Sequence, residues 1–560
     1  MTPLLRSLSW FLLTACLAVP IASYGEQDSG TSPSSEAESG PRVHAPAGAV
    51  EGLAEGSLRV FKGIPYAAPP VGPARWKPPE PAPRWTGIRQ ATGFGPACIA
   101  PSPRMNTIYS SDIAPFSEDC LTLNVWAPAD ATGAPVFFWV HGGALRAGSS
   151  KESLYDGSRL AQRGLVVVSI NYRLGVLGYL AHPELSAESP LGVSGNYGLL
   201  DQIQALRWVH ANIEAFGGDP ANVTIAGESA GALSVMYLLA APDARGLFSR
   251  AIAQSAYMVS MPELKESRFG PAAEVLGAGL AATLQAPDIA AMRATDAQTL
   301  ADGAAAAYYF PSGTVDGKVL PRQLVDVFDR GEQVPVPILA GFNSGEIRSL
   351  TVLAPPTPAS AEEYESVIRE RYLDLADEFL RLYPSSDMQE SIYATTRDAL
   401  YGWTSERLVR KHTELGQPSF LYIFDHGYPA ADDAGLHAFH ASELPYMWGN
   451  LDLTPPNWPK IPDTAEESRF AEAMVGYWSS FARDGQPTAA GEPDWPAYES
   501  SRSFMLLGGT PQPSKHLLPG MYELHERVVC RRRASGEIAW HWNVGLASPP
   551  LPAGSDTPCP

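Results

Sequence analysis

The stretch FGGDPANVTIAGESAG, Phe216 to Gly231, decides the fold. After Phe216 it has two glycines, then the apolar run VTIA, and it ends with Ser229 between Gly227 and Gly231. The apolar run predicts a buried strand, and the segment AGALSVMYLLA that follows predicts a helix. A tight turn between them needs small residues, and it lifts a serine above the sheet where helix amides point toward it. We therefore predict that Ser229 is a nucleophile rather than one more serine in a glycine-rich chain.

Short apolar runs alternate with helical patterns on both sides of this stretch. The runs are continuous rather than alternating, which predicts strands covered on both faces and hence a mostly parallel sheet flanked by helices. Ligands bind such α/β sheets beyond the carboxyl ends of the strands. Strands are expected over 135–143, 164–174, 222–229, 334–343 and 419–426, and helices over 196–216 and 230–240.

Length and charge argue against some classes of function. The chain has 560 residues with a formal net charge of -20. An acidic chain is repelled by phosphate backbones, which argues against nucleic-acid binding. After the N-terminus no run reaches the ~20 apolar residues of a membrane span.

The N-terminus has the pattern of an export signal. Arg6 precedes the apolar run FLLTACLAVPIA, and small residues follow, so residues 1–25 are expected to be a signal peptide. An alternative is a lipoprotein anchored through Cys16. The polar stretch 26–45 is expected to be a disordered leader, 46–535 the folded domain, and 536–560 a poorly ordered tail.

A serine hydroxyl needs a base to take its proton, and the base needs an acid to orient it. Glu346 stands just past the expected strand 334–343 and is the candidate acid. His437 and His440 both lie in the loop after the expected strand 419–426, and loop position alone does not choose between them. Nucleophile, acid, histidine is the chain order expected for this architecture.

The tetrahedral intermediate needs hydrogen-bond donors for its oxyanion. Gly142 and Gly143 follow the expected strand 135–143, where no side chain obstructs their backbone N–H groups. With the N–H of Ala230 they can form an oxyanion hole. Arg146, shortly after them, could face the leaving group or solvent.

Four cysteines remain after the signal: Cys98, Cys120, Cys530 and Cys559. An even number in an exported chain suggests disulfides, and four cysteines allow three pairings. The pairing with the shortest loops is Cys98–Cys120 with Cys530–Cys559.

From about Gly48 to Cys530 the sequence resembles the type-B carboxylesterases of the α/β-hydrolase fold, a family that includes the cholinesterases. The motifs that carry the resemblance are FKGIPYAAPPVGPARWKPP, EDCLTLNVWAP, FGGDPANVTIAGESAG, NSGEIRSL and HASELPYMWG. The resemblance implies Ser229 as nucleophile, Glu346 as acid and His440, not His437, as base. It also implies Gly142, Gly143 and Ala230 as oxyanion donors.

The resemblance implies structural features as well. Cys98–Cys120 matches the family's N-terminal disulfide, and Cys559 is left as the partner of Cys530. The expected salt bridges are Arg75–Glu118 and Arg173–Asp219, and the expected buried acids are Glu228 beside the nucleophile and Glu443 near the histidine. The Cys98–Cys120 loop lacks the tryptophan that binds choline in cholinesterases, and its only aromatic residues are Tyr109 and Phe116.

The function expected is hydrolysis of a small carboxylic ester through an acyl-enzyme on Ser229, with no metal or organic cofactor. The alternative is a non-catalytic binding or adhesion protein on the same fold. The sequence does not separate ester from amide, carbamate or lactone substrates, and it leaves the oligomeric state open.

Overall fold

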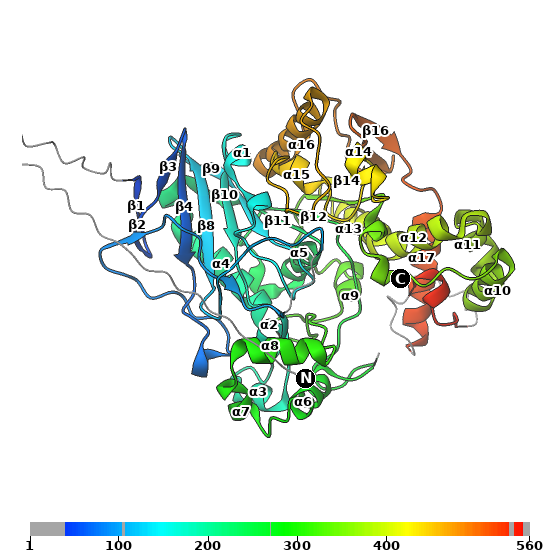
Figure 1. Cartoon of the computed structure of the whole chain (residues 1–560), viewed down its shortest axis with the longest axis horizontal. Coiled ribbons are helices and arrows are strands. Elements are labelled where there is room, and N and C mark those ends of the chain that lie inside the picture. The colour runs from blue at the N-terminus through cyan, green and yellow to red at the C-terminus, as the bar shows by residue number, and fades with distance from the viewer. Residues whose placement is uncertain (1–39, 103–106, 269, 537–542, 553–560) are drawn as a thin grey trace, which may run out of the picture. The chain divides into compact units, whose positions relative to one another are not determined.

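The computed structural model describes residues 40–102, 107–268, 270–536 and 543–552. They are built around one large sheet with strand order β16-β15-β14-β13-β12-β11-β9-β10-β8-β4-β3 (Figure 1). Its strands are β3 (Leu53–Glu55), β4 (Leu58–Pro65), β8 (Thr122–Pro128), β9 (Ala134–Val140), β10 (Val166–Ile170), β11 (Gly218–Glu228), β12 (Arg250–Gln254), β13 (Ile338–Asn343), β14 (Ser419–Phe424), β15 (Ser503–Leu507) and β16 (Pro511–Lys515).

The centre of the sheet is parallel, as the continuous apolar runs predicted. Strands β10, β9, β11, β12, β13, β14 and β15 pair in parallel. Antiparallel pairs involve β8, β4 and β3 at one edge and β16 at the other. The carboxyl ends of the central strands therefore meet along one edge, where ligand sites form in α/β sheets.

Strand β9 shows why these runs are apolar on both sides. Val136, Phe138 and Val140 join one buried cluster together with residues of α4 (Tyr197–Asn212) and α5 (Ala230–Ala240). The residues between them, Phe137 and Trp139, join a second cluster with α16 (Ala465–Asp484). Because successive side chains of a strand point to opposite faces, helices cover both faces of the sheet. In Figure 1, α16 lies on one side of the sheet and α4 and α5 on the other.

The remaining helices pack around this frame. They are α1 (Ser158–Ala161), α2 (Gly175–Tyr179), α3 (Pro183–Glu188), α6 (Ala273–Thr283), α7 (Ile289–Ala294), α8 (Ala297–Ala306), α9 (Leu324–Asp329), α10 (Ala361–Tyr372), α11 (Ala376–Leu382), α12 (Met388–Arg397), α13 (Trp403–Glu414), α14 (Pro429–Asp433), α15 (Leu444–Trp448) and α17 (Met521–Ser535). Within the described ranges, none of the helices has the length and apolar character needed to cross a membrane.

Two small sheets complete the fold. One contains β1 (Arg42–Ala45), β2 (Gly48–Glu51) and β5 (Ile88–Gln90), and the other contains β6 (Ala97–Cys98) and β7 (Phe116–Ser117). The expected leader over 26–45 was too long at its C-terminal end, because β1 pairs with β2 there. The expected signal peptide, with Cys16, and the rest of the leader to residue 39 lie outside the described residues.

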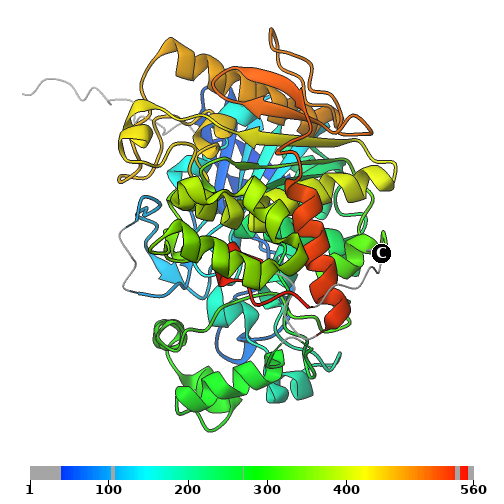
Figure 2. The same cartoon turned by 90° about the vertical axis from the view of Figure 1, so that its right-hand side faces the viewer.

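The expectation of a poorly ordered tail is wrong for residues 543–552. This segment contains a 3-10 turn, Gly545–Ala547, and its Leu551 is buried. Asn543 bonds to both Tyr372 of α10 and His525 of α17, at 2.9 and 2.7 Å. Figure 2 shows α17 in red beside the yellow-green helices of the 361–397 region against which the segment packs. The tail was expected to be poorly ordered, but these buried polar contacts hold residues 543–552 in place.

Candidate active site

Ser229 occupies the turn between β11 and α5. Its φ of 55° and ψ of -120° are unusual for a residue with a side chain, and its backbone N–H donates to Gln254 at 2.9 Å. A Cβ on Gly231 would lie 2.1 Å from the carbonyl oxygen of Val140, and one on Gly227 would lie 2.4 Å from the carbonyl carbon of Gly231. Glycine is therefore required at both positions for the strand and helix to approach, which agrees with the turn that the sequence predicted.

Glu346 lies three residues after the end of β13 and is fully buried. Its Oε1 accepts hydrogen bonds from the hydroxyl of Ser255 at 2.6 Å and from the backbone N–H of Asn343 at 2.8 Å. Its Oε2 accepts a hydrogen bond from Nδ1 of His440. Both oxygens of this buried carboxylate are thus engaged, and they fix which way the imidazole faces.

The structure separates the two candidate histidines. His440 lies in the loop after β14 and pairs with Glu346, 94 residues away in the chain. His437, three residues earlier, faces Asp432 and Asp425 instead, and its side chain is 42% exposed. Only His440 therefore has the buried carboxylate that a general base needs for orientation.

The second nitrogen of His440, Nε2, lies 3.1 Å from Oε1 of Glu228. Burial raises the pKa of Glu228, and the neighbouring carboxylates of Glu443 and Glu346 add to the rise. Burial lowers the pKa of His440, but the charges of Glu228 and Glu346 outweigh burial and raise it. One imidazole thus lies among three buried carboxyl groups, and the structure records no hydrogen bond between it and Ser229 within the described residues.

Glu443 is the third of these carboxyl groups. It accepts hydrogen bonds from the side-chain amides of Gln254 at 2.9 Å and Asn343 at 2.6 Å. Burial raises its pKa to about 7. Asn343 thereby connects Glu443 to the strand end that holds Glu346, so the expectation of a buried supporting acid near the histidine agrees with its surroundings.

Gly142 and Gly143 follow β9 and lie beside the serine. A Cβ on Gly142 would be 3.4 Å from the Cβ of Ser229 and 2.9 Å from a side-chain oxygen of Glu228. Gly143 has a φ of +102°, which disfavours any other residue. Within the described ranges, the backbone N–H groups of Gly142, Gly143 and Ala230 donate to no other residue. They are thus available as donors at the position predicted for an oxyanion hole.

His141 supports this loop rather than the chemistry. Its Nδ1 lies 2.8 Å from the carbonyl oxygen of Gly142, and its ring stacks on Tyr172 at 4.6 Å. Burial lowers the pKa of His141 to about 4, so the ring is neutral at neutral pH. Because Nδ1 faces a carbonyl, it carries the ring proton and donates. Arg146, further along the loop, is half-buried and makes no ion pair with a described residue.

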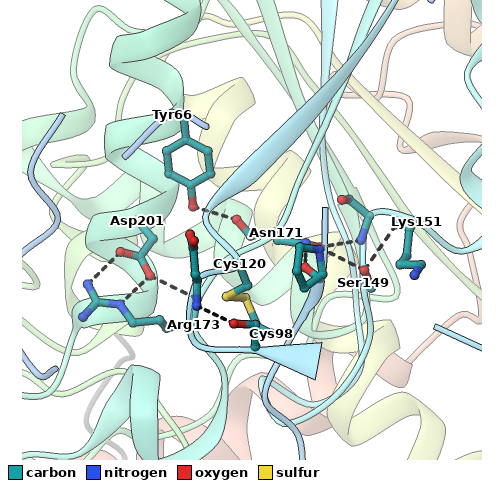
Figure 3. The surroundings of a disulfide bond; sticks show 12 residues. Tyr66, Cys98, Cys120, Ser149, Lys151, Asn171, Arg173 and Asp201 are labelled. Atoms are coloured by element: carbon teal, nitrogen blue, oxygen red, sulfur yellow. Dashed lines mark hydrogen bonds and ion pairs between the residues drawn. A yellow bond between two sulfur atoms is a disulfide. The ribbon is translucent and has the colours of Figure 1, made fainter. Parts of the chain in front are cut away.

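The Cys98–Cys120 disulfide is present, as the resemblance implied (Figure 3). Around it, Asn171 donates to Pro96 at 3.0 Å and accepts from Ser149. The Arg75–Glu118 salt bridge is also confirmed, with two bonds of 2.6 Å. Cys530 is disulfide-bonded, and its expected partner, Cys559, lies outside the described residues.

The expected Arg173–Asp219 salt bridge is wrong. Arg173 pairs with Asp201 of α4 through bonds of 2.8 and 2.7 Å, and both side chains are buried (Figure 3). Asp219 accepts the backbone N–H of Ala221 and closes a local turn. Asp201 lies on the buried face of a helix that packs on the sheet, whereas Asp219 is only half-buried at the start of β11, so Asp201 is the acid that meets the buried guanidinium.

Sequence reasoning missed three residues near the histidine. Ser255, which donates to Glu346, follows the end of β12, so its place after a parallel strand was a usable signal. Tyr401 lies in a π-helical turn, Asp398–Gly402, with its ring 5.4 Å from that of His440. Tyr109 donates its hydroxyl to the backbone carbonyl of His440 at 2.9 Å. Nothing local in the sequence around Tyr109 or Tyr401 indicated these contacts.

Comparisons with known proteins agree with this geometry. The model of the carboxylesterase family matches residues 39–522. The chain is 37% identical to a fumonisin B1 esterase of Sphingopyxis macrogoltabida over 522 residues, covering 90% of this chain and 91% of that protein. It is 36% identical to a para-nitrobenzyl esterase of Bacillus subtilis (strain 168), covering 82% and 93%. A solved structure of a PNB esterase matches with a TM-score of 0.75 at 33% identity, covering 86% and 99%. The chain therefore belongs to the carboxylesterase family, has the α/β-hydrolase fold and is a carboxylic ester hydrolase.

Proposed function

We propose that the chain cleaves its ester through an acyl-enzyme on Ser229, with His440 as general base and Glu346 as the acid that orients it. Ser229 Oγ attacks the ester carbonyl carbon while its proton passes to Nε2 of His440. The Nδ1–H bond to Glu346 holds the imidazole in one tautomer and stabilises its positive charge. His440 then protonates the leaving alcohol, and water repeats the sequence on the acyl-enzyme.

The oxyanion of each tetrahedral intermediate is assigned to the backbone N–H groups of Gly142, Gly143 and Ala230. Removing one such donor typically raises a barrier by about 3–4 kcal/mol. Support comes from the position of Gly142 against Ser229 and from the absence of competing acceptors for these N–H groups in the described part of the chain. Ala230 is also the first residue of α5, where a helix leaves its N–H groups unpaired.

One observation carries the proposal: the buried pairing of His440 with Glu346 next to the residue pair Glu228–Ser229. For proton transfer, Nε2 of His440 must come within hydrogen-bond reach of Ser229 Oγ when substrate binds. Such hydrogen bonds are often long or misdirected before substrate is present and tighten in the complex.

The two neighbouring histidines offer a matched test. Hydrolysis of p-nitrophenyl butyrate is measured for the wild type, Ser229→Ala, His440→Ala and the control His437→Ala. We expect the first two variants to lose at least about a thousandfold in kcat and the control to stay within about twofold. A Ser229→Ala variant that keeps its turnover would contradict the proposal. A folded wild type inactive on every ester tried would favour the binding-protein alternative.

The substrate class is the next question. The names of two relatives supply a fumonisin ester and a para-nitrobenzyl ester as candidates beside p-nitrophenyl butyrate. We propose small carboxylic esters as substrates. Comparing kcat/KM for each ester with that for a matched amide, carbamate and lactone ranks the classes, and an amide ranked first would overturn this choice.

We also propose that the chain is exported, through a signal peptide over residues 1–25 or as a lipoprotein on Cys16. The Cys98–Cys120 disulfide supports this location, because disulfides persist in oxidising compartments. N-terminal sequencing and mass spectrometry of the mature protein separate the two routes: a free N-terminus near residue 25 supports the first and a lipidated Cys16 the second. An intact N-terminus in the cytoplasmic fraction would contradict both.

A further inference from the structure

Tyr109 belongs to the loop closed by Cys98–Cys120, yet its hydroxyl reaches the active site. It donates to the backbone carbonyl oxygen of His440 at 2.9 Å and lies 2.7 Å from Oγ of Ser349. A phenol has one hydrogen, and the His440 carbonyl can only accept. Ser349 must therefore donate to the Tyr109 oxygen, and the hydroxyl connects two groups at once.

The two groups belong to different parts of the proposed triad. Ser349 caps the turn Glu346–Arg348, which carries the acid after β13. His440 is the base, in the loop after β14. Gly345 also links these loops by donating to the carbonyl of Ala438 at 2.9 Å. Tyr109 adds a link from a third segment, which precedes both loops in the sequence.

The backbone at this point needs support. The carbonyl that accepts from Tyr109 belongs to the peptide between His440 and Ala441, and Ala441 has a φ of +68°. A residue with a side chain adopts this conformation only when its surroundings hold it there. The hydrogen bond from Tyr109 holds the peptide that sets the direction of the His440 side chain.

The ring of Tyr109 is itself fixed. It packs edge-on against the imidazole of His440, with centroids 6.4 Å apart, and against Trp458 at 5.9 Å. Asn457 donates to the carbonyl of Thr107, two residues before the tyrosine, at 3.2 Å. The disulfide and the Asn171 bond to Pro96 anchor the base of the loop (Figure 3).

We propose that Tyr109 is a positioning residue that clamps the acid turn to the histidine loop and so keeps His440 aligned for proton transfer. This inference rests on the proposed function of His440 and Glu346. It assigns the Cys98–Cys120 loop a part in the chemical step rather than in substrate binding, and it gives Tyr109, one of the two aromatic residues of this loop, a role.

Tyr109→Phe removes the hydroxyl and keeps the ring. The matched control is Tyr477→Phe. Tyr477 lies in α16 and also donates to a backbone carbonyl, that of Pro493, at 2.6 Å. We expect Tyr109→Phe to lower kcat for p-nitrophenyl butyrate about five- to tenfold with KM within twofold, since one neutral hydrogen bond shifts an equilibrium by about that factor. The rate constant for labelling by a fluorophosphonate should fall equally. The control should leave kcat and the labelling rate constant unchanged, while lowering Tm about as much as Tyr109→Phe does.

A second variant tests the clamp itself. Ser349→Ala alone should lower kcat less than Tyr109→Phe does, and the double variant should be no slower than Tyr109→Phe, because both changes break one connection. The inference would be overturned if wild type and Tyr109→Phe had equal kcat, or if the variant only raised KM. If wild type and His440→Ala label at the same rate, the proposed function fails instead, so the two failures are distinguishable.

Discussion

Oε1 of Glu228 lies 3.1 Å from Nε2 of His440, and no hydrogen bond joins the two atoms. The proposed nucleophile, Ser229, is the next residue in the chain and needs the same nitrogen. The carboxyl group and the hydroxyl therefore compete for one imidazole nitrogen. Once the pH exceeds the raised pKa of Glu228, its negative charge favours the protonated ring, which cannot act as a base.

Glu228→Gln should move the acidic limb of the pH profile of kcat/KM to lower pH. Burial lowers the pKa of His440, whereas the charges of Glu228 and Glu346 raise it. Without the Glu228 charge the pKa falls, so His440 stays neutral and competent at lower pH. The measurement is kcat/KM from acidic to alkaline pH, because the pKa of His440 is raised to about 9. The surface variant Glu472→Gln, whose side chain is 58% exposed, should leave the limb in place. A limb that moves up in pH would contradict the sign.

Ser229→Gly should be more stable than Ser229→Ala by about 1 kcal/mol, although both should be inactive. The φ of 55° at this residue costs energy for any side chain, and glycine removes this cost. Urea denaturation followed by tryptophan fluorescence gives the difference in free energy of unfolding. An alanine variant equal to or more stable than the glycine variant would mean that the turn stores no strain.

Gly231→Ala should lose activity and roughly 2–3 kcal/mol of unfolding free energy, because the new Cβ overlaps the backbone of β9. That atom would lie 2.1 Å from the carbonyl oxygen of Val140. The control Gly279→Ala is in α6, where a Cβ meets no atom within 4 Å, and it should be neutral or slightly stabilising. Thermal unfolding and turnover of both variants test this pair. Equal behaviour of the two would show that the β9–α5 contact relaxes easily.

Asp201→Asn should cost about 3–5 kcal/mol, because it leaves Arg173 as an uncompensated buried charge. The two side chains are 4% and 0% exposed. The control Asp243→Asn breaks an ion pair with Arg207 whose side chains are 49% and 66% exposed, and such pairs contribute about 0–1 kcal/mol. Chemical denaturation of both variants gives the comparison. A small loss at Asp201 would mean that water or Lys77, whose carbonyl Arg173 also contacts, compensates the guanidinium.

The sequence was sufficient for the sheet and the turn because these depend on local pattern. Apolar runs predicted β9, β10, β13 and β14, and the glycine spacing predicted the turn at Ser229. Glu346 and His440 could be predicted as candidates because both follow parallel strands, but choosing His440 over His437 required the resemblance.

Contacts between distant segments could not be predicted in this way. Arg173 has several acids near it in sequence, and only the packing of α4 brings Asp201 to it. Tyr109 meets His440 across 331 positions, through a loop whose path depends on the rest of the fold. The order of residues 543–552 depends on polar groups of α10 and α17, which composition alone does not reveal.

The packing of residues 543–552 has a consequence for the order in which contacts form during folding. Burial lowers the pKa of His525 to about 4, so it is neutral, and the Asn543 amide donates to its Nδ1. The proton then sits on Nε2, which donates to Tyr383, and Tyr383 donates to Asp398 at the start of the π-helical turn that carries Tyr401. A nascent chain still short of Asn543 lacks the first donor of this series. The part of this support that runs through His525 therefore forms only after Asn543 has been synthesised and has docked.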